Sequence, residues 1–449
     1  MNHGRNFNEI SERIFALLKK KGVAESEVYY RASKLLTISS EGGEVEDFRF
    51  SEPYGVSLRV IVNGGMGFSF STHPDNGALA DMVDDAISSA KNSTPDEHYA
   101  LSAPSPVPDA GLIFDDSIEG VPIEEKVERA REVEAGALSV DKRVKRVRSA
   151  QYSEALSRVF LRNSNGVDVG YKKSYVTAQL MAVAQENGDQ EMGWDVDSSI
   201  KYADLAPREV GRGAGIKAVS MLGAKRAPTG RFTALLTREV VSDLLDVLAP
   251  SFLGENVLKG KSIFKGKGGK KIISSELTIV DDGLLPGGIG TFPVDGEGVP
   301  QRRNSLVAKG VVEGFLYDLL NAGRAGVDPT GSSVRGGVTA PPSSGVNNFY
   351  IVPGVEDADS LLKRAGRGII ISELMGVHTA NPVTGEFSVG ASGFIFEDGR
   401  RSQPFKEAAV SGDLMGLFSK IAAVGSDLKF FGNIGAPSLL ISEVELSGE

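Results

Sequence analysis

The chain contains no cysteine and only four histidines among its 449 residues. The absence of cysteine excludes disulfides, thiolate nucleophiles and every zinc site that uses sulfur ligands. The histidines, His3, His73, His98 and His378, lie far apart in the sequence, so no pair has the spacing of a metal-binding helix. A zinc site would therefore require the fold to bring distant histidines and carboxylates together.

Long apolar runs are also missing. No stretch approaches the roughly 20 apolar residues that cross a bilayer, and the first ten residues, MNHGRNFNEI, lack the hydrophobic segment of a secretory signal. We therefore expect a cytoplasmic protein that does not bind membranes. The net charge of −10 disfavours direct binding to nucleic acid. The basic run at 259–271, KGKSIFKGKGGKK, could form a local patch, but a solvated loop is the favoured interpretation.

The composition is that of a globular protein, with 41% hydrophobic and 24% charged residues. Because 449 residues exceed one ordinary hydrophobic core, we expect two domains. The boundary is placed where a linker-like stretch with Pro228 and Gly230 begins, giving domains at 1–224 and 225–449.

The N-terminal half shows helical and β patterns in a repeated order. The sequence predicts helices at 7–21, 79–90, 123–140 and 206–222, and groups of short antiparallel strands at 27–71 and 144–197. Residues 92–122 are rich in proline and serine and are expected to form an exposed connection. The order helix, strands, helix occurs twice, which indicates an α+β domain built from a duplicated unit.

The C-terminal half is dense in glycine and predicts a mostly β domain with glycine-rich loops. A strand at 232–236 leads into a helix at 238–248, and a second helix is expected at 414–424. Between them, residues 368–398 read as a buried strand, a loop and two further β segments at 386–389 and 393–397.

Carboxylates cluster at Asp281-Asp282 and at Asp295-x-Glu297. Such clusters bind hard cations or a substrate amine. Asp-Asp-Gly and Asp-Gly-Glu-Gly are equally typical of tight turns, in which aspartate accepts backbone N–H groups and glycine adopts positive φ. The turn is the favoured interpretation.

Nucleotide and serine-hydrolase motifs are excluded by spacing. The stretch from Gly254 to Ser262 has five residues where a phosphate-binding loop has four, and no hydrophobic strand precedes it. The glycines at 211–215 are expected inside a helix. No G-x-S-x-G sequence occurs.

Several blocks in one order resemble the TldD/PmbA family, described as modulators of DNA gyrase and as zinc-peptidase subunits. They are LTIVDDG at 277–283, DGEGVPQRRNSLVAKGVVEGFLYD at 295–318, IVPG at 351–354, SELMG with TGEFSVGASGFIFEDGR between 372 and 400, and VGSDL at 424–428. From these blocks we select candidate substrate-binding or partner-binding residues. They are Asp281, Asp282, Asp295, Glu297, Glu373, His378, Gly385 and Phe387.

The resemblance implies that active members carry a His-Glu-x-x-x-His helix directly after the strand FTALL, and a cysteine near the C-terminus. Here that helix reads TREVVSDLLDVL (237–248), which keeps Glu239 but has Arg238, Ser242 and Asp243 at or near the histidine positions. The chain therefore looks like the PmbA (TldE) branch, a pseudoenzyme subunit with no catalytic residue, metal ligand or cofactor of its own.

By the same resemblance, the partner is a TldD-like subunit that carries zinc, and the heterodimer processes unfolded peptides such as a peptide-antibiotic precursor or an antitoxin. Alone, the chain is expected to form a homodimer. Two alternatives stay open. One is a self-sufficient hydrolase that uses Glu239, Asp243, Asp282 or His378, and the other is a protein that binds and modulates gyrase.

Overall fold

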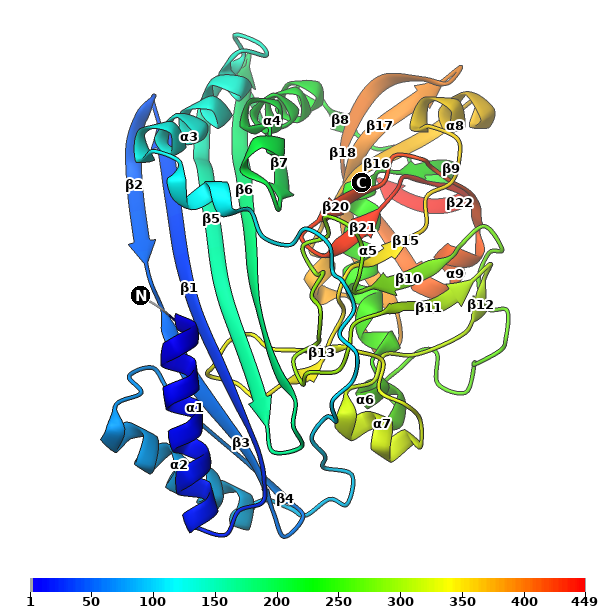
Figure 1. Cartoon of the computed structure of the whole chain (residues 1–449). Coiled ribbons are helices and arrows are strands. Elements are labelled where there is room, and N and C mark those ends of the chain that lie inside the picture. The colour runs from blue at the N-terminus through cyan, green and yellow to red at the C-terminus, as the bar shows by residue number, and fades with distance from the viewer. Residues whose placement is uncertain (1–2, 449) are drawn as a thin grey trace.

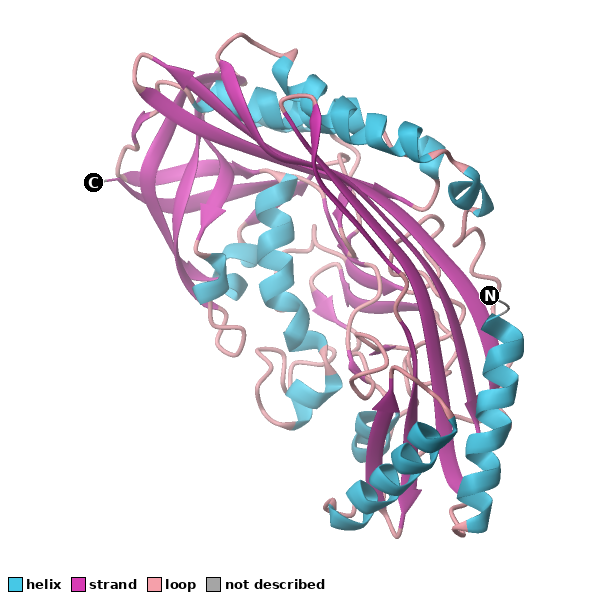
Figure 2. Ribbon diagram, turned by 90° about the vertical axis from the view of Figure 1, so that its left-hand side faces the viewer, coloured by secondary structure: helices cyan, strands magenta, loops and turns pink. Residues whose placement is uncertain are grey.

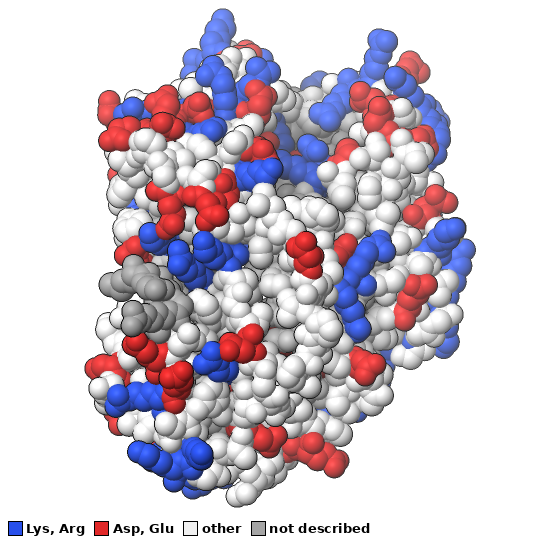
Figure 3. All heavy atoms as spheres, in the orientation of Figure 1, with Lys and Arg blue, Asp and Glu red and all other residues white. Residues whose placement is uncertain are grey.

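The structure is a computed structural model that describes residues 3–448. A sheet of very long strands from the N-terminal half lies beside a β domain from the C-terminal half (Figure 1). Within the described residues, no helix is long and apolar enough to pass through a membrane. Basic and acidic side chains are interspersed over the face shown in Figure 3.

The N-terminal sheet is antiparallel throughout, in the order β4-β3-β1-β5-β6-β7, with β2 paired to the second half of β1. Its strands are β1 (Glu25–Glu41), β2 (Glu44–Ser51), β3 (Tyr54–Val62), β4 (Gly65–Ser71), β5 (Val144–Asn163), β6 (Asp168–Glu186) and β7 (Asp189–Ser199). The two expected groups of strands therefore form one continuous sheet, because β1 pairs with β5 along 14 residues.

The strands are longer than the sequence pattern predicts. The apolar runs at 28–30 and 36–38 belong to the single strand β1, so the expectation of separate strands is wrong there. The polar residues between them, Arg31 and Ser33, continue the strand with side chains on its other face. Val28 and Tyr30 pack against helices, whereas Tyr29 and Arg31 face the C-terminal domain.

Helices cover the apolar outer face of this sheet in two groups. The helices α1 (His3–Lys20) and α2 (Asn76–Asn92) enclose one core with β1 and β3. The helices α3 (Ile123–Leu138) and α4 (Pro207–Met221) enclose a second core with β5 and β6. Short 3-10 turns lie at η1 (Asp116–Gly120) and η2 (Tyr202–Asp204). Figure 2 shows the bent strands with α1, α3 and α4 along their outer side.

These helices confirm the predictions at 7–21, 79–90, 123–140 and 206–222 within a few residues at each end. The expectation that the connection at 92–122 is exposed is wrong in part, because some of its residues are buried. Leu101 is 6% exposed and Ser102 is 4% exposed, and the Ser102 hydroxyl donates to the carbonyl oxygen of Glu297 at 2.5 Å. This segment therefore helps to attach the two domains to each other.

The C-terminal domain contains two main sheets. The larger has the order β19-β22-β9-β16-β17-β18-β8, and an extra pairing of β22 with β18 closes five of these strands into a ring. Its strands are β8 (Lys225–Arg226), β9 (Gly230–Leu236), β16 (Gly368–Met375), β17 (Glu386–Glu397), β18 (Arg400–Asp413), β19 (Ile421–Val424) and β22 (Leu439–Gly448).

The second sheet has the order β12-β11-β10-β15-β21-β20. It comprises β10 (Ile279–Asp282), β11 (Arg303–Ala308), β12 (Val311–Val312), β15 (Phe349–Ile351), β20 (Lys429–Phe431) and β21 (Ile434–Ala436). A small hairpin of β13 (Ser333–Val334) and β14 (Ser343–Ser344) stands apart. The basic run at 259–271 forms turns and loop with mostly exposed lysines, as expected, but Phe264 within it is fully buried in the hydrophobic core.

Helix α5 (Arg238–Leu248) is central to the C-terminal core. It buries Val241, Leu244, Leu245 and Leu248 in a cluster that includes strands of both sheets. The shorter helices are η3 (Ala249–Phe252), α6 (Gly254–Leu258), α7 (Leu319–Ala325), α8 (Ala358–Ala365), η4 (Val377–Thr379) and α9 (Leu414–Ser419).

The predicted helix at 238–248 is confirmed, whereas the one at 414–424 is wrong over its second half. Helix α9 ends at Ser419, and residues 421–424 form strand β19. Likewise, the segments expected at 386–389 and 393–397 are one strand, β17, that turns at Asp398 and Gly399, both with positive φ.

Candidate functional site

Hydrogen bonds of the sheet fix the start of the helix at which the resemblance implies a metal-binding motif. Strand β9 runs between β16 and β22, and the backbone N–H of Thr237 donates to the carbonyl of Ile371 at 3.1 Å. Helix α5 begins at the next residue, so Glu239 lies in its first turn. Asp243 is four residues on and lies on the same side of the helix.

A lysine from the N-terminal domain occupies the place beside Glu239. The Nζ of Lys217, on α4, lies 3.0 Å from the Glu239 carboxylate and 3.4 Å from that of Asp195 on β7. Lys429 lies 2.9 Å from Asp195 on its other side. Burial opposes the ionisation of Glu239, but the charge and hydrogen bond of Lys217 outweigh it and lower the pKa of that carboxyl.

Other carboxylates lie around the same helix. Partial loss of solvent, together with the charges of Asp246, Glu239 and Glu373, raises the pKa of Asp243 to about 6. Glu373, on β16, accepts a hydrogen bond from the Ser392 hydroxyl at 3.1 Å. Among the described residues, no three His, Cys, Asp or Glu side chains are arranged to hold a metal ion.

This set of side chains does not fit a zinc centre of the His-Glu-x-x-x-His type. Zinc in such a site needs two neutral imidazoles from the helix and a free glutamate. Here Arg238 and Asp243 stand where the imidazoles would be, and Glu239 is bound to the ammonium of Lys217. The cation beside Glu239 is thus the ammonium group of Lys217.

The carboxylates selected from the sequence around β10 are buried. Asp281 is fully buried and accepts from the backbone N–H and side-chain amide of Asn347, at 2.7 and 3.0 Å. Burial raises the pKa of Asp281 to about 7, although the hydrogen bonds from Asn347 favour the charged form. Asp282 accepts from the backbone N–H of Leu284 at 3.0 Å and lies 3.7 Å from Arg303.

Asp295 accepts hydrogen bonds from backbone N–H groups, as expected for an aspartate in a tight turn. One of its oxygens accepts from the backbone N–H groups of Glu297 and Val299, at 2.8 and 3.0 Å, and the other from that of Ser333 at 3.0 Å. Burial and the neighbouring charge of Glu297 raise the pKa of Asp295.

Glu297 belongs to an ion-pair network that joins the domains. Its carboxylate lies 2.5 Å from Arg59 of β3, whose other nitrogen lies 3.0 Å from Glu27 of β1. Arg335, from the C-terminal domain, also pairs with Glu27. All four side chains are less than a tenth exposed. Sequence analysis did not identify Glu27, Arg59 or Arg335.

The remaining candidates are not joined to this network. His378 is exposed on η4, which follows β16. Gly385 has φ of +78° and closes a turn by donating to the carbonyl of Asn381 at 2.8 Å. Phe387 is part of the hydrophobic core. The side chain of His3 is outside what the structure describes.

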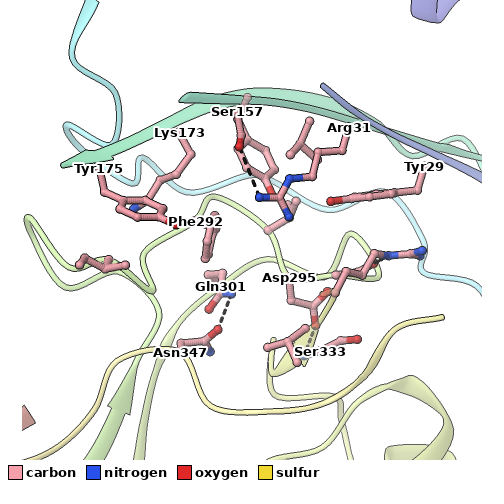
Figure 4. Close-up of a pocket in the computed structure, with 17 residues that line it drawn as sticks. Tyr29, Arg31, Ser157, Lys173, Tyr175, Phe292, Asp295, Gln301, Ser333 and Asn347 are labelled. Carbon is pink, nitrogen blue, oxygen red and sulfur yellow. Dashed lines mark hydrogen bonds between the residues drawn. The ribbon is translucent and has the colours of Figure 1, made fainter. Parts of the chain in front are cut away.

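Between the inner face of the N-terminal sheet and the C-terminal loops lies a cavity of about 200 Å³ (Figure 4). Both domains contribute its walls. Its polar lining residues include Tyr29, Arg31, Tyr171, Lys173, Asp295 and Gln301. The Nζ of Lys173 donates to the carbonyls of Gly288 and Thr291, each at 3.0 Å, and burial lowers the pKa of this amine to about 7.

Comparison with family models covers most of the chain. Residues 26–90 match domain 1, residues 116–222 the central domain, and residues 229–448 the C-terminal domain of the PmbA/TldA metallopeptidases. The chain belongs to the PmbA/TldD family. The resemblance found in the C-terminal blocks is thereby confirmed and extends through the N-terminal half.

Relatives of the PmbA/TldD family match over nearly their whole length. The metalloprotease PmbA of Escherichia coli O157:H7 is 26% identical over 423 residues, covering 92% of this chain and 90% of the relative. A metalloprotease TldD homolog of Haemophilus influenzae is 24% identical, covering 97% of this chain and 95% of the relative. Both branches of the family are thus similar to this chain.

Solved structures confirm the α+β fold. A Thermotoga maritima protein described as a modulator of DNA gyrase has a TM-score of 0.90 and 27% identity, covering 98% of this chain and all of that one. TldE from Thermococcus kodakarensis has a TM-score of 0.89 at 22% identity, covering 97% of this chain and all of that one, which shows a shared fold.

Proposed function

We propose that this chain is the metal-free subunit of a TldD/TldE-type peptidase complex, in which a TldD-like partner carries zinc. The observation that carries the proposal is the ion pair between Glu239 and Lys217, at 3.0 Å. A glutamate that activates water must be free to accept a proton. The lysine stabilises Glu239 as a paired carboxylate, and Arg238 and Asp243 offer no imidazole beside it.

The role left to this chain is to hold an unfolded peptide against the catalytic partner. Strand β7 supports this role, because it is the last strand of the N-terminal sheet and pairs with β6. Its Met192 and Trp194 side chains are 56% and 43% exposed. An extended peptide can add to such an edge through backbone hydrogen bonds that tolerate many sequences, except at Trp194, whose carbonyl accepts from Lys217 at 3.0 Å. In the absence of the partner, two copies of the chain pair with each other.

The test is co-expression with a TldD-like zinc subunit, followed by cleavage of an unstructured peptide that carries a fluorophore and a quencher. The chain alone should be inactive and the mixture active, with activity lost on chelation. Glu239→Gln and Asp243→Ala in this chain should leave the turnover number of the complex within about twofold.

Chelator-sensitive cleavage by the purified chain alone would overturn the proposal. Loss of that cleavage in Glu239→Gln, with the fold intact by circular dichroism, would instead establish the self-sufficient hydrolase. A copy of the TldD-like subunit with its own metal-binding histidines replaced by alanine is the control, because the mixture should then be inactive.

A further inference from the structure

We propose that the cavity between the domains binds a zwitterion the size of one α-amino acid, with its carboxylate at Arg31 and its ammonium group at Asp295. This inference does not rest on the proposed pairing with a zinc subunit, since the cavity lies within the chain. Its volume of about 200 Å³ exceeds that of the ~150 Å³ cavity that holds benzene in another protein.

Arg31 supplies the positive pole of the cavity. No carboxylate of the described residues lies within 4 Å of its guanidinium, which makes only long hydrogen bonds to the hydroxyls of Ser33 and Ser157, at 3.3 and 3.4 Å. The other cations of the lining are already engaged: Arg335 by Glu27 and the carbonyl of Gly296, and Lys173 by two carbonyls.

Two tyrosines line the cavity together with this guanidinium. Tyr29 and Tyr171 have no side-chain hydrogen-bond partner among the described residues, and both line the cavity. In Figure 4, the hydroxyl of Tyr29 and the guanidinium of Arg31 point into the same space. Burial raises the pKa of both tyrosines, so their hydroxyls remain protonated and available as donors. A guanidinium with phenol donors is a typical receptor for a carboxylate.

Asp295 supplies the negative pole. It lines the same cavity as Arg31 and Tyr171. Burial and the neighbouring charge of Glu297 disfavour its charged form and raise its pKa, and no Lys or Arg of the described residues lies within ion-pair distance of it. A ligand ammonium group would provide that missing cation. A zwitterion therefore matches both poles, whereas a simple anion matches only one.

Part of the cavity lining consists of rings and aliphatic side chains. The ring centroids of Tyr171 and Phe292 are 5.8 Å apart, and Val159, Ile289 and Val294 complete this wall. Such a lining favours an aromatic or branched aliphatic side chain on the ligand. This wall therefore fits the side chain of a hydrophobic amino acid.

The test is calorimetric titration of the purified full-length chain with phenylalanine, phenylalanine amide and N-acetylphenylalanine. Phenylalanine should bind saturably at one site per chain. The amide lacks the carboxylate and the acetylated form lacks the ammonium group, so each should bind at least about tenfold more weakly, the usual cost of one charge-assisted hydrogen bond.

Substitutions of cavity residues test whether phenylalanine binds in this cavity. Arg31→Met removes only long hydrogen bonds to serine, so it should fold, and it should weaken phenylalanine binding about 10- to 100-fold. Tyr171→Phe should weaken binding less. Arg49→Met, on the exposed strand β2, is the matched control and should bind as the parent does. If phenylalanine and leucine show no saturable binding, or if Arg31→Met binds phenylalanine unchanged, the cavity holds only water and the proposal is wrong.

Discussion

Lys173 shows how burial changes the chemistry of a single residue. It lies on the inner face of the sheet, is 5% exposed, and has its amine directed at two backbone carbonyls. Its neighbour Lys172 lies on the opposite face and is exposed. Burial lowers the pKa of Lys173 to about 7, far below the ~10.4 of a lysine in an unfolded chain.

This depressed pKa predicts a pH-dependent stability. Below pH 7 the folded state must bury a charged amine, and between pH 7 and 10 the unfolded state binds more protons than the folded state, so the free energy of unfolding rises with pH. Relative to Lys173→Met, the parent should gain about 2–3 kcal/mol between pH 6.5 and 9, measured by urea unfolding. Lys172→Met should show no such trend, and a flat difference for Lys173→Met would contradict the assignment.

Residue patterns in the sequence identified only one of the four residues of the charged network, Glu297. Glu297 stood out because it neighbours Asp295, whereas Glu27 and Arg59 are polar residues in strands that also carry apolar ones. Such a mixture is typical of a sheet with one face in water. Here a second domain covers the polar face, and the chain gives no local sign of which face is covered. The only signal in the sequence for a covered polar face was the large number of charged residues on neighbouring strands.

At the scale of elements, glycines set the contact between α3 and α4. The run that looked like part of a dinucleotide motif, Gly211 to Gly215, lies in α4, as the sequence predicted. A Cβ on Gly211 would lie 1.9 Å from the carbonyl oxygen of Val133, and a Cβ on Gly136 would lie 2.1 Å from that of Arg208. The helices therefore approach so closely that only hydrogen fits between their backbones.

This packing predicts opposite effects for two glycine-to-alanine changes. Gly211→Ala should destabilise the protein by about 1–3 kcal/mol, because a backbone carbonyl cannot move aside as a flexible side chain can. Gly77→Ala, in α2, meets nothing closer than 3.5 Å and should be neutral or stabilise by up to about 1 kcal/mol through helix propensity. Thermal unfolding of both variants checks the pair, and equal effects would show that the helices do not pack this closely.

The elements that the sequence missed have weak periodicity. Helix α7 buries only Asn321 and Ala322, and helix α8 only Leu361 and Leu362. Segments of seven or eight residues with two buried positions give too few turns to establish a 3.6-residue period. By contrast, α1 and α5 bury apolar residues along several turns and were predicted nearly to their ends.

At the scale of the whole molecule, the two domains are joined by buried charge. Arg59 connects Glu27 of its own sheet with Glu297 of the other domain, and Arg335 reaches back to Glu27. The burial of Ser102 against Glu297 adds a third connection. Because the candidate cavity lies next to this network, the relative position of the domains determines its shape.

Replacement of Arg59, the central cation of the network, should lower the free energy of unfolding. Arg59→Met leaves Glu27 and Glu297 buried with fewer partners, so we expect a loss of about 3–5 kcal/mol in the free energy of unfolding. Arg49→Met breaks an exposed pair with Asp47 and should cost less than about 1 kcal/mol. Chemical denaturation of both variants at one pH is the measurement. A loss below 1 kcal/mol for Arg59→Met would mean that the network does not hold the domains together.

The assignment of this chain as the metal-free subunit is tested most directly by zinc analysis of the purified protein, alone and in complex with a TldD-like subunit. We expect well under 0.1 zinc per chain alone, about one zinc per heterodimer, and no change on Glu239→Gln in this chain, because Lys217 rather than a metal accompanies that glutamate. About one tightly held zinc in the chain alone, lost on Glu239→Gln, would contradict the account.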